Sequence, residues 1–240
     1  MRYRISVAYN GSKFYGFQRL KGKRTVQGEL ESALTKINKQ KLEVKGAGRT
    51  DRGVHALDQG VHFDLDVKVP PKRLKNAINS IVKPDILVND VVIVDDDFHA
   101  RFNVVKKTYT YVINLGEFDT IKDDFLYNYN RDLNISAMKR ASKVFLGPHS
   151  FECFTSGERE SYDSIIYKIK IKKKKNLLYL TFEGKSFYRY MVRNMVGSLV
   201  TVGEGKLNSS DISAYLTGEK KNIRYTTVPA NGLYLVKIDY

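Results

Sequence analysis

The sequence of 240 residues is 42% hydrophobic and 28% charged. A chain of this length buries roughly 70–75% of its unfolded surface, and this composition excludes a disordered or fibrous protein. The single cysteine, Cys153, excludes an intramolecular disulfide. No apolar run is long enough to span a membrane, and the first residues form a strand-like pattern rather than a signal peptide. We therefore expect a cytoplasmic protein with no membrane partner.

Lysine and arginine outnumber aspartate and glutamate by 41 to 26, which gives a formal net charge of +15. The excess is divided about equally between the two halves of the chain, so it does not form a detachable basic tail. An enzyme for small neutral metabolites has no need of such a field, whereas a polyanionic ligand is attracted by it. The 16 tyrosines and 12 phenylalanines add faces on which bases can stack. Nucleic acid is therefore the predicted partner, and a merely basic protein is the alternative.

Strand and helix patterns follow one another through the first half of the chain. Strands are predicted at residues 4–10, 42–48, 59–65 and 86–94. Apolar residues at helical spacing predict a helix over residues 26–37, with Thr25 as its cap. A second helix is predicted over residues 74–81, introduced by Pro70 and Pro71.

The second half of the chain has a similar mixture. Strands are predicted at residues 108–113, 164–173, 177–183 and 232–240, the middle two joined by a turn near Asn176. The predicted helices are one over residues 137–145 behind Ser136, one that begins near Phe187 and runs to about Leu199, and a short one behind Ser209 or Ser210.

The similar share of strands and helices in the two halves predicts an α+β fold, with two related α/β layers that share one continuous, mainly antiparallel sheet. We place the two halves at residues 1–104, which carry the Asp51 loop described next, and residues 105–240, together forming one unit. No linker rich in Pro, Gly or Ser separates them. A cleft near residues 100–110 is the expected place for a large ligand.

The most unusual segment covers residues 46–56, with the sequence GAGRTDRGVHA. Gly48 and Gly53 have the spacing of a phosphate-binding loop, but Val and His follow where that motif has Lys and then Ser or Thr. A dinucleotide-binding fingerprint fails because its third glycine is missing. The segment therefore predicts a glycine-bracketed loop that presents Asp51 between two arginines, which favour the ionised carboxylate. The alternative is an aspartate that only caps a turn.

Further short motifs are distributed along nearly the whole chain. They are Tyr9, Gly11, Ser12, Tyr15, Gly16 and Gln18; Thr25-Val26-Gln27 with Leu30-Glu31; Asp97-Phe98-His99-Ala100-Arg101-Phe102; Tyr109 and Tyr111; Met191-Val192-Arg193-Asn194 with Gly197; and Gly232-Leu233-Tyr234-Leu235. Together with residues 48–56, their order and spacing resemble the TruA family of tRNA pseudouridine synthases, in which residues 48–51 and 53–56 match the catalytic-aspartate motif.

This resemblance implies a cofactor-free isomerase that breaks the N-glycosidic bond of a tRNA uridine, turns the uracil over and forms a C–C bond to the ribose. It assigns Asp51 as the essential aspartate and Arg193 as the basic residue that pairs with it. Tyr109 takes the place of the base-stacking tyrosine, and Arg49 that of the arginine that helps to hold the substrate backbone and the flipped-out geometry. The resemblance also implies two ferredoxin-like halves with an active-site cleft between them, and a homodimer that acts on the anticodon stem-loop.

Elementary chemistry supports a carboxylate in this role, because a carboxylate can trap an electron-poor sugar or add to a base. Three routes stay open for Asp51: attack at C6 of uracil, attack at C1′ of the ribose, and elimination to a glycal with proton removal at C2′. Flipping a stacked uridine costs a few kcal/mol, and an aromatic ring such as Tyr109 can return about 1–3 kcal/mol. The alternative for Tyr109 is an ordinary strand residue that shares a face with Tyr111.

Two interpretations, anion binding and simple solvent exposure, apply to the other basic residues. Arg189 and Arg193 are four residues apart on the predicted helix, where like charges repel unless an acid or a phosphate lies between them. The alternative interpretation is that both side chains lie at the solvated edge of the helix. Lys170 and residues 172–175 predict a solvated strand edge, with phosphate contact as an additional role.

The histidines have spacings unlike those of metal sites, so they are expected to be structural, His55 bracing the active loop, and no metal is predicted. Asn10, Phe17 and Arg52 stand where the family usually has Asp, Trp and a small residue. None of the three replaces a catalytic group, but Arg52 adds a positive charge beside Asp51 and bears on substrate fit. The same reaction on ribosomal RNA and a non-catalytic RNA-binding or chaperone protein are the alternative functions.

Overall fold

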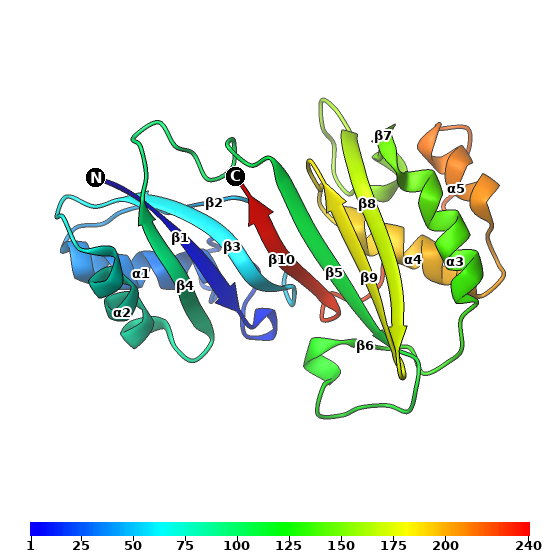
Figure 1. Ribbon diagram of the computed structural model, residues 1–240, viewed down its shortest axis with the longest axis horizontal. Coiled ribbons are helices and arrows are strands. Elements are labelled where there is room, and N and C mark those ends of the chain that lie inside the picture. Colours follow the sequence, from blue (N-terminus) through cyan, green and yellow to red (C-terminus); the bar gives the residue numbers. More distant parts are fainter. The chain divides into compact units, whose positions relative to one another are not determined.

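The computed structural model describes residues 1–240, which form two compact units. The first unit contains Met1–Val105 together with Tyr234–Tyr240, and the second contains Lys106–Leu233 (Figure 1). The last strand therefore groups with the first part of the chain. No helix has the length and apolar character needed to cross a membrane.

The first unit has a sheet with β1 (Arg2–Tyr9) between β3 (His55–Asp64) and β4 (Ile86–Ile93), both antiparallel to it. Strand β10 (Leu233–Asp239) pairs in parallel with β3, and the short β2 (Lys45–Gly46) pairs antiparallel with β3. Helices α1 (Val26–Asn38) and α2 (Pro71–Val82) contact each other, and α2 contacts β4.

The alternation of side chains explains how this sheet is covered. Tyr3, Ile5, Val7 and Tyr9 of β1 are buried, whereas the residues between them are half-buried. One face of β1 therefore lies against the core, as period-two alternation requires. Helix α1 begins where Thr25 accepts a hydrogen bond from the Gly28 amide, a typical N-cap contact.

The second unit has a sheet in the order β5 (Lys106–Asn114), β9 (Leu177–Gly184), β8 (Asp163–Lys174) and β7 (Gly147–Ser150), with neighbours antiparallel. Strand β6 (Tyr127–Asn128) pairs in parallel with β5. The helices are α3 (Ile135–Ser142), α4 (Met191–Gly203) and α5 (Ser209–Leu216). Four short 3-10 segments complete the secondary structure of the chain: η1 (Gly11–Lys13), η2 (Asp123–Phe125), η3 (Lys143–Phe145) and η4 (Glu152–Phe154).

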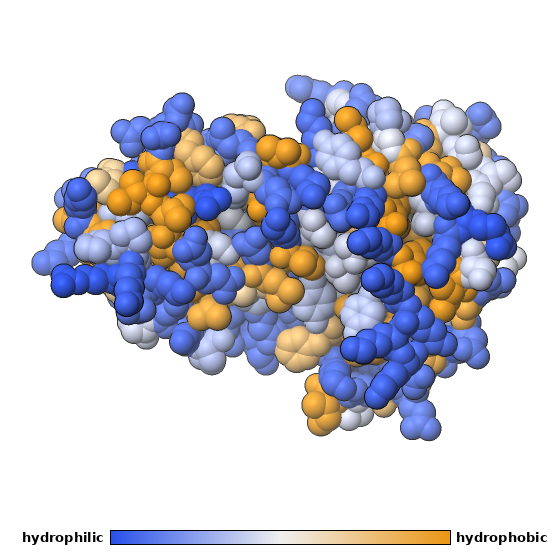
Figure 2. All heavy atoms as spheres, in the orientation of Figure 1, coloured by the Kyte–Doolittle hydropathy of each residue, from blue (hydrophilic) through white to orange (hydrophobic).

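An aromatic cluster supports the helices of the second unit. Phe145, Phe151 and Phe154 are fully buried, and the ring of Phe154 stacks on that of Tyr225 at 5.4 Å and 6°. Tyr215 of α5 meets both Phe154 and Tyr225 edge to face. Such pairs stabilise a core beyond the area that they bury. Hydrophilic residues cover much of the molecular face in Figure 2, with apolar residues between them.

The predicted α+β class and its mainly antiparallel pairing are confirmed. One predicted strand, over residues 42–48, is wrong in extent because only Lys45 and Gly46 pair with β3. The helix predicted to begin near Phe187 begins at Met191. The caps of α3 and α5 are Asn134 and Asn208 rather than the serines that follow them.

Candidate active site

Asp51 lies in a loop between β2 and β3 whose shape is fixed by backbone hydrogen bonds. The Asp51 carbonyl accepts a bond from the Val54 amide at 3.1 Å, and Gly53 has φ +84°, so residues 51–54 form a tight turn. A positive φ at the third position of such a turn favours glycine. The Asp51 side chain is half-buried, whereas Thr50 beside it is buried and Arg49 is exposed. The predicted glycine-bracketed loop around Asp51 is thus confirmed.

Residues distant in sequence hold this loop in place. The Phe17 amide donates to the Thr50 carbonyl at 3.0 Å, and the Gln59 side-chain amide donates to the Gly48 carbonyl at 2.9 Å. The Tyr9 and Thr50 hydroxyls are 2.8 Å apart and buried. Burial raises the pKa of Tyr9 to about 12, so its hydroxyl stays neutral. Gly48 and Thr50, on the N-terminal side of Asp51, therefore have buried partners on β1, β3 and the segment after η1.

Two glycines allow the η1 segment to approach the loop. A Cβ on Gly11 would overlap the Val54 carbonyl, and a Cβ on Gly16 would lie 2.9 Å from the Thr50 carbonyl. Gly16 also has φ +93°, a conformation that other residues rarely adopt. Only glycine fits at these two positions, which explains two of the motif residues in physical terms.

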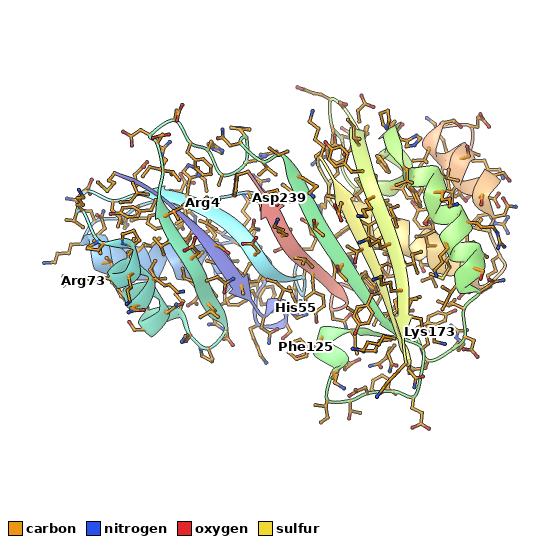
Figure 3. The ribbon with its side chains drawn as sticks, viewed as in Figure 1. Arg4, His55, Arg73, Phe125, Lys173 and Asp239 are labelled. Atoms are coloured by element: carbon orange, nitrogen blue, oxygen red, sulfur yellow. The ribbon has the colours of Figure 1, made fainter.

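His55 follows the loop and starts β3 (Figure 3). Its Nδ1 accepts a hydrogen bond from the Gly11 amide at 3.1 Å, and its ring stacks on Tyr234 at 4.7 Å. The predicted bracing role of His55 is consistent with these contacts. No group of three or more His, Cys, Asp or Glu residues is placed to hold a metal ion.

Each of the three residues that depart from the family pattern makes a defined contact in the structure. The Asn10 side chain accepts from the Ser12 amide at 3.1 Å and caps η1. The Phe17 ring is buried and lies over Gly46. The Arg52 guanidinium lies 4.4 Å from the centre of the Tyr15 ring, in a cation–π contact. Arg52 directly follows Asp51 in the sequence, and this contact holds its side chain against Tyr15.

Tyr109 lies on β5 of the second unit and is 8% exposed. Its ring meets that of Phe187 edge to face, with centroids 5.1 Å apart. Tyr109 pairs directly with Phe182 of β9, and both side chains lie on the buried face of the sheet. The ring is therefore fixed in position, with a small part of its surface accessible.

Arg193 lies in the first turn of α4, and its guanidinium is held on two sides. Its Nε donates to the Val228 carbonyl at 2.8 Å, and its guanidinium lies 4.8 Å from the centre of the Tyr190 ring. Arg189 packs on the same ring at 4.9 Å. Arg189 precedes α4, so the prediction that Arg189 and Arg193 lie on one helix is wrong. Both guanidiniums contact the ring of Tyr190.

Sequence reasoning missed Tyr190, which has φ +64° directly before α4. A tyrosine in the left-handed region is strained, and such strain is often found at functional sites. The start of α4 is also fixed by Asn194, which donates to the Phe154 carbonyl and accepts from the Thr227 hydroxyl. No sequence signal marks Tyr190, because its conformation depends on the side chains that pack around it.

The structure thus brings Arg49 and Asp51 together in one loop of the first unit. It places Tyr109 and Arg193 in the second unit, the former on β5 and the latter on α4. Asp51 and Arg193 are half-buried, Tyr109 is buried and Arg49 is exposed. A carboxylate on an anchored turn, an ordered aromatic ring and an ordered guanidinium are groups suited to chemistry on a flipped base.

Comparison with known proteins assigns the family. The family model described as tRNA pseudouridine synthase matches residues 5–103 and 141–240. The chain is 40% identical over 245 residues to tRNA pseudouridine synthase A of Listeria monocytogenes serotype 4a (strain HCC23), covering 100% of this chain and 99% of that protein. It is 36% identical over 245 residues to tRNA pseudouridine synthase A of Bacillus subtilis (strain 168), again covering 100% and 99%.

Among solved structures, a chain of an H/ACA RNP bound to a substrate RNA that contains 2'-deoxyuridine is similar over 83% of this chain and 53% of its own length. The TM-score is 0.36 and the identity 10%, which is too slight a likeness to bear on function. The sequence relatives cover both units from end to end. The chain therefore belongs to the TruA family of tRNA pseudouridine synthases and is an isomerase that modifies tRNA.

Proposed function

We propose that the chain converts uridine to pseudouridine in the anticodon stem-loop of tRNA, with Asp51 as the nucleophile. In this isomerisation the bond from C1′ to N1 breaks and a bond from C1′ to C5 forms, while C5 loses a proton and N1 gains one. The atoms of substrate and product are the same, and no electrons are exchanged with another compound. The reaction therefore needs no cofactor, in keeping with carboxylate catalysis.

The observation that supports this proposal most directly is the turn that carries Asp51. Its backbone is anchored through Thr50, Gly48 and Val54, while the Asp51 side chain keeps partial exposure. A nucleophile needs this combination, because a fixed position lowers the entropic part of the barrier and exposure admits the substrate. Addition of the carboxylate to C6, its addition to C1′ and the glycal route all begin from such a group.

The other three residues have supporting roles in this proposal. Tyr109 stacks on the flipped uracil and returns about 1–3 kcal/mol of the unstacking cost. Arg193 pairs with the Asp51 carboxylate and keeps it ionised. Arg49, exposed beside the turn, holds the phosphate backbone of the flipped nucleotide. The net charge of +15 attracts the RNA to the protein.

The same proposal includes the finer architecture expected from the resemblance: ferredoxin-like halves at residues 1–104 and 105–240, a shared continuous sheet and an active-site cleft. It also includes a cytoplasmic homodimer. The oligomeric state is checked by light scattering of the purified protein across a concentration series, and a monomer at all concentrations would remove this part alone.

The variant Asp51→Asn tests the catalytic assignment, since it keeps the size of the side chain and removes the charge. We expect it to abolish tritium release from tRNA that contains 5-tritiated uridine and to leave the affinity for tRNA nearly unchanged. Asp95→Asn removes an exposed carboxylate elsewhere in the same unit and serves as the matched control. Persistent tritium release by Asp51→Asn would show that another residue is the nucleophile.

The substrate is tested separately from the mechanism. Pseudouridine mapping in tRNA and ribosomal RNA from a deletion strain distinguishes the two RNA classes, and we expect only tRNA to lose pseudouridine, in the anticodon arm. Loss confined to ribosomal RNA would favour the alternative substrate. Purified protein that forms no pseudouridine in any RNA but binds it tightly would favour a chaperone.

A further inference from the structure

Strand β8 carries four lysines at alternate positions, and all four side chains are exposed: Lys168, Lys170, Lys172 and Lys174. We call these residues the β8 lysine row. Because side chains alternate along a strand, the four project from one face of the sheet. In Figure 2, hydrophilic atoms follow β8 toward its turn into β9, and Figure 3 marks the neighbouring Lys173 at this end.

The row lies on the face of the sheet opposite to Tyr109. Strand register places Ile169 beside Phe182 and Phe182 beside Tyr109, so these residues share one face of the sheet, on which Phe182 and Tyr109 are buried. The register places Lys170 beside Thr181 on the other face, where the Thr181 hydroxyl is 2.9 Å from that of Thr110.

Helices cover the Tyr109 face and leave the row uncovered. Helix α4 contacts β5 and α3 contacts β8, and Figure 1 shows α4 behind β8 and β9. Arg193 lies on α4 and therefore on the same side of the sheet as Tyr109. Within the second unit, the candidate site residues and the β8 lysine row are thus on opposite faces.

The charges of the row are not neutralised along its own strand. No Asp or Glu occurs between Ser164 and Lys174. Glu183, the acid paired with Lys168 across the ladder, already forms an ion pair with Lys106 at 3.2 Å. Lys168 and Lys172 lower the pKa of Lys170 through their charges, which shows that the ammonium groups repel one another. Lysines about 6.8 Å apart along a strand lie within the Debye length of about 8 Å at physiological salt.

A polyanion with regularly spaced charges would relieve this repulsion. Two residues of an extended strand rise by about 6.8 Å, a distance similar to the spacing of successive phosphates along a nucleic-acid strand. Lysine binds phosphate as a point charge and needs no fixed side-chain geometry. Tyr179, half-buried and paired with Lys172, adds an aromatic surface within the same face.

We propose that the β8 lysine row binds the phosphate backbone of tRNA in a part of the molecule outside the anticodon arm. This inference rests on the proposed function, because it assumes that the anticodon arm is the segment that reaches Tyr109. A nucleotide at Tyr109 and a phosphate at the row are separated by the sheet, so a short stem-loop does not engage both. The row therefore distinguishes a complete tRNA from its isolated anticodon arm.

A simpler role for these lysines is protection of a strand edge. Strand β7 pairs with β8 only from Asp163 to Ile166, and charge on the remaining edge opposes association with other strands. Protection of an edge predicts aggregation when the charges are removed and no change in RNA affinity. Phosphate binding predicts that the affinity for RNA decreases and that the protein does not aggregate.

The test uses the full chain with the triple variant Lys168→Gln/Lys170→Gln/Lys172→Gln. The matched control is Lys36→Gln/Lys139→Gln/Lys143→Gln, which removes three exposed lysines from α1, α3 and η3. Dissociation constants are measured by filter binding at several salt concentrations, with complete tRNA and with the isolated anticodon stem-loop.

We expect the row variant to bind complete tRNA about tenfold more weakly than the control, with a salt slope reduced by about 0.9 for each duplex phosphate that the variant no longer neutralises. Stem-loop affinity should equal that of the control. Equal affinity and slope of both variants for complete tRNA would overturn the proposal, as would an equal decrease for stem-loop and complete tRNA. The single variant Lys170→Gln gives the same comparison at one position if the triple variant does not fold.

Failure of this proposal is distinguishable from failure of the proposed function. Binding is measured without turnover, whereas the proposed function is judged by tritium release from the unmodified protein. The variant Lys168→Arg/Lys170→Arg/Lys172→Arg keeps the charges and should restore both the affinity and the salt slope. Weaker binding by this arginine variant would show that charge is not the property used, and would also overturn the proposal.

Discussion

The hydroxyls of Tyr9 and Thr50 lie 2.8 Å apart in the core of the first unit, and Thr50 directly precedes Asp51 in the sequence. This hydrogen bond joins β1 to the candidate catalytic loop. Its removal leaves the remaining buried hydroxyl without its partner, which typically costs about 1–3 kcal/mol. The position of Asp51 therefore depends on a side chain more than forty residues earlier in the chain.

We expect Tyr9→Phe and Thr50→Val each to lower the free energy of unfolding by about 1–3 kcal/mol. The double variant should be destabilised by less than the sum of the two, because no buried hydroxyl is then unpaired. Urea denaturation of the four proteins measures these differences. Strict additivity would show that the two hydroxyls do not interact.

Gly11→Ala should disrupt the loop more strongly than other glycine substitutions. A Cβ on Gly11 would overlap the Val54 carbonyl, which is backbone and cannot rotate away. We expect a decrease of about 3 kcal/mol or more in the free energy of unfolding. Gly22→Ala is the control, with φ +70° but no atom within 4 Å of its Cβ, and should cost about 1–2 kcal/mol. Thermal or urea unfolding compares them, and equal decreases would contradict the close approach.

Tyr109→Ala tests the proposed stacking of this ring on the flipped base, and it should weaken substrate use. We expect kcat/KM to fall roughly five- to 150-fold, which corresponds to a loss of about 1–3 kcal/mol of stacking free energy. Tyr109→Phe keeps the ring and its contact with Phe187, so it should retain most of the activity. Melting temperatures separate this effect from the cavity that alanine leaves. Equal activity of the alanine and phenylalanine variants would remove the stacking role.

Tyr190 is expected to position Arg193, and this prediction rests on the proposed role of Arg193. Tyr190→Phe keeps the ring under both guanidiniums, whereas Tyr190→Asn suits the left-handed backbone but removes the ring. We expect near-normal turnover for Phe and a fall of about tenfold to a hundredfold for Asn. The measurement is the single-turnover rate at saturating tRNA. A normal rate for the Asn variant would show that the ring does not hold Arg193.

His62 gives the first unit a predictable response to acid. Burial, followed by the charges of His99 and Arg2, lowers the pKa of His62 from 6.5 to about 4. Its Nδ1 accepts a hydrogen bond from the Ala100 amide at 3.0 Å, so the neutral ring is the one that fits. Because the folded state binds fewer protons than the unfolded state between these values, stability falls as pH decreases from about 6.5 to about 4.

The pH dependence is measured by urea unfolding at intervals across that range, and NMR titration follows the His62 ring directly. His62→Gln keeps an acceptor for the Ala100 amide without a titrating group in this range, and should flatten the dependence. An unchanged slope in this variant would assign the acid response to other groups.

Local patterns in the sequence were sufficient for most elements of the fold. The alternation in β1 predicts its core-facing residues, and Thr25 predicts the start of α1. Local patterns failed where pairing or packing between distant residues decides the outcome. The strand predicted over residues 42–48 alternates in the right way, but only Lys45 and Gly46 find partners on β3. The start of α4 was misplaced because Tyr190 breaks the helix through a backbone conformation that its sequence does not announce.

The candidate site shows the same division. The glycines around Asp51 predict a tight loop because their backbone requirements are local. The contacts that anchor the loop, from Tyr9 to Thr50 and from His55 to Gly11, join residues more than forty positions apart and have no local signature. The roles of Tyr109, Arg49 and Arg193 came from the family resemblance, since an aromatic or basic residue in a strand or helix has many ordinary uses.

Strand β10 gives the first unit an order of assembly. Synthesis proceeds from the N-terminus, so β3 and its loop emerge long before residues 234–240, with the whole of the second unit made in between. Tyr234, on which the His55 ring stacks, is among the last partners to arrive. A nascent chain that ends before Tyr234 lacks part of the support behind Asp51. The stack between His55 and Tyr234 can therefore form only after residues 106–233 have been made, long after residues 46–56 emerge.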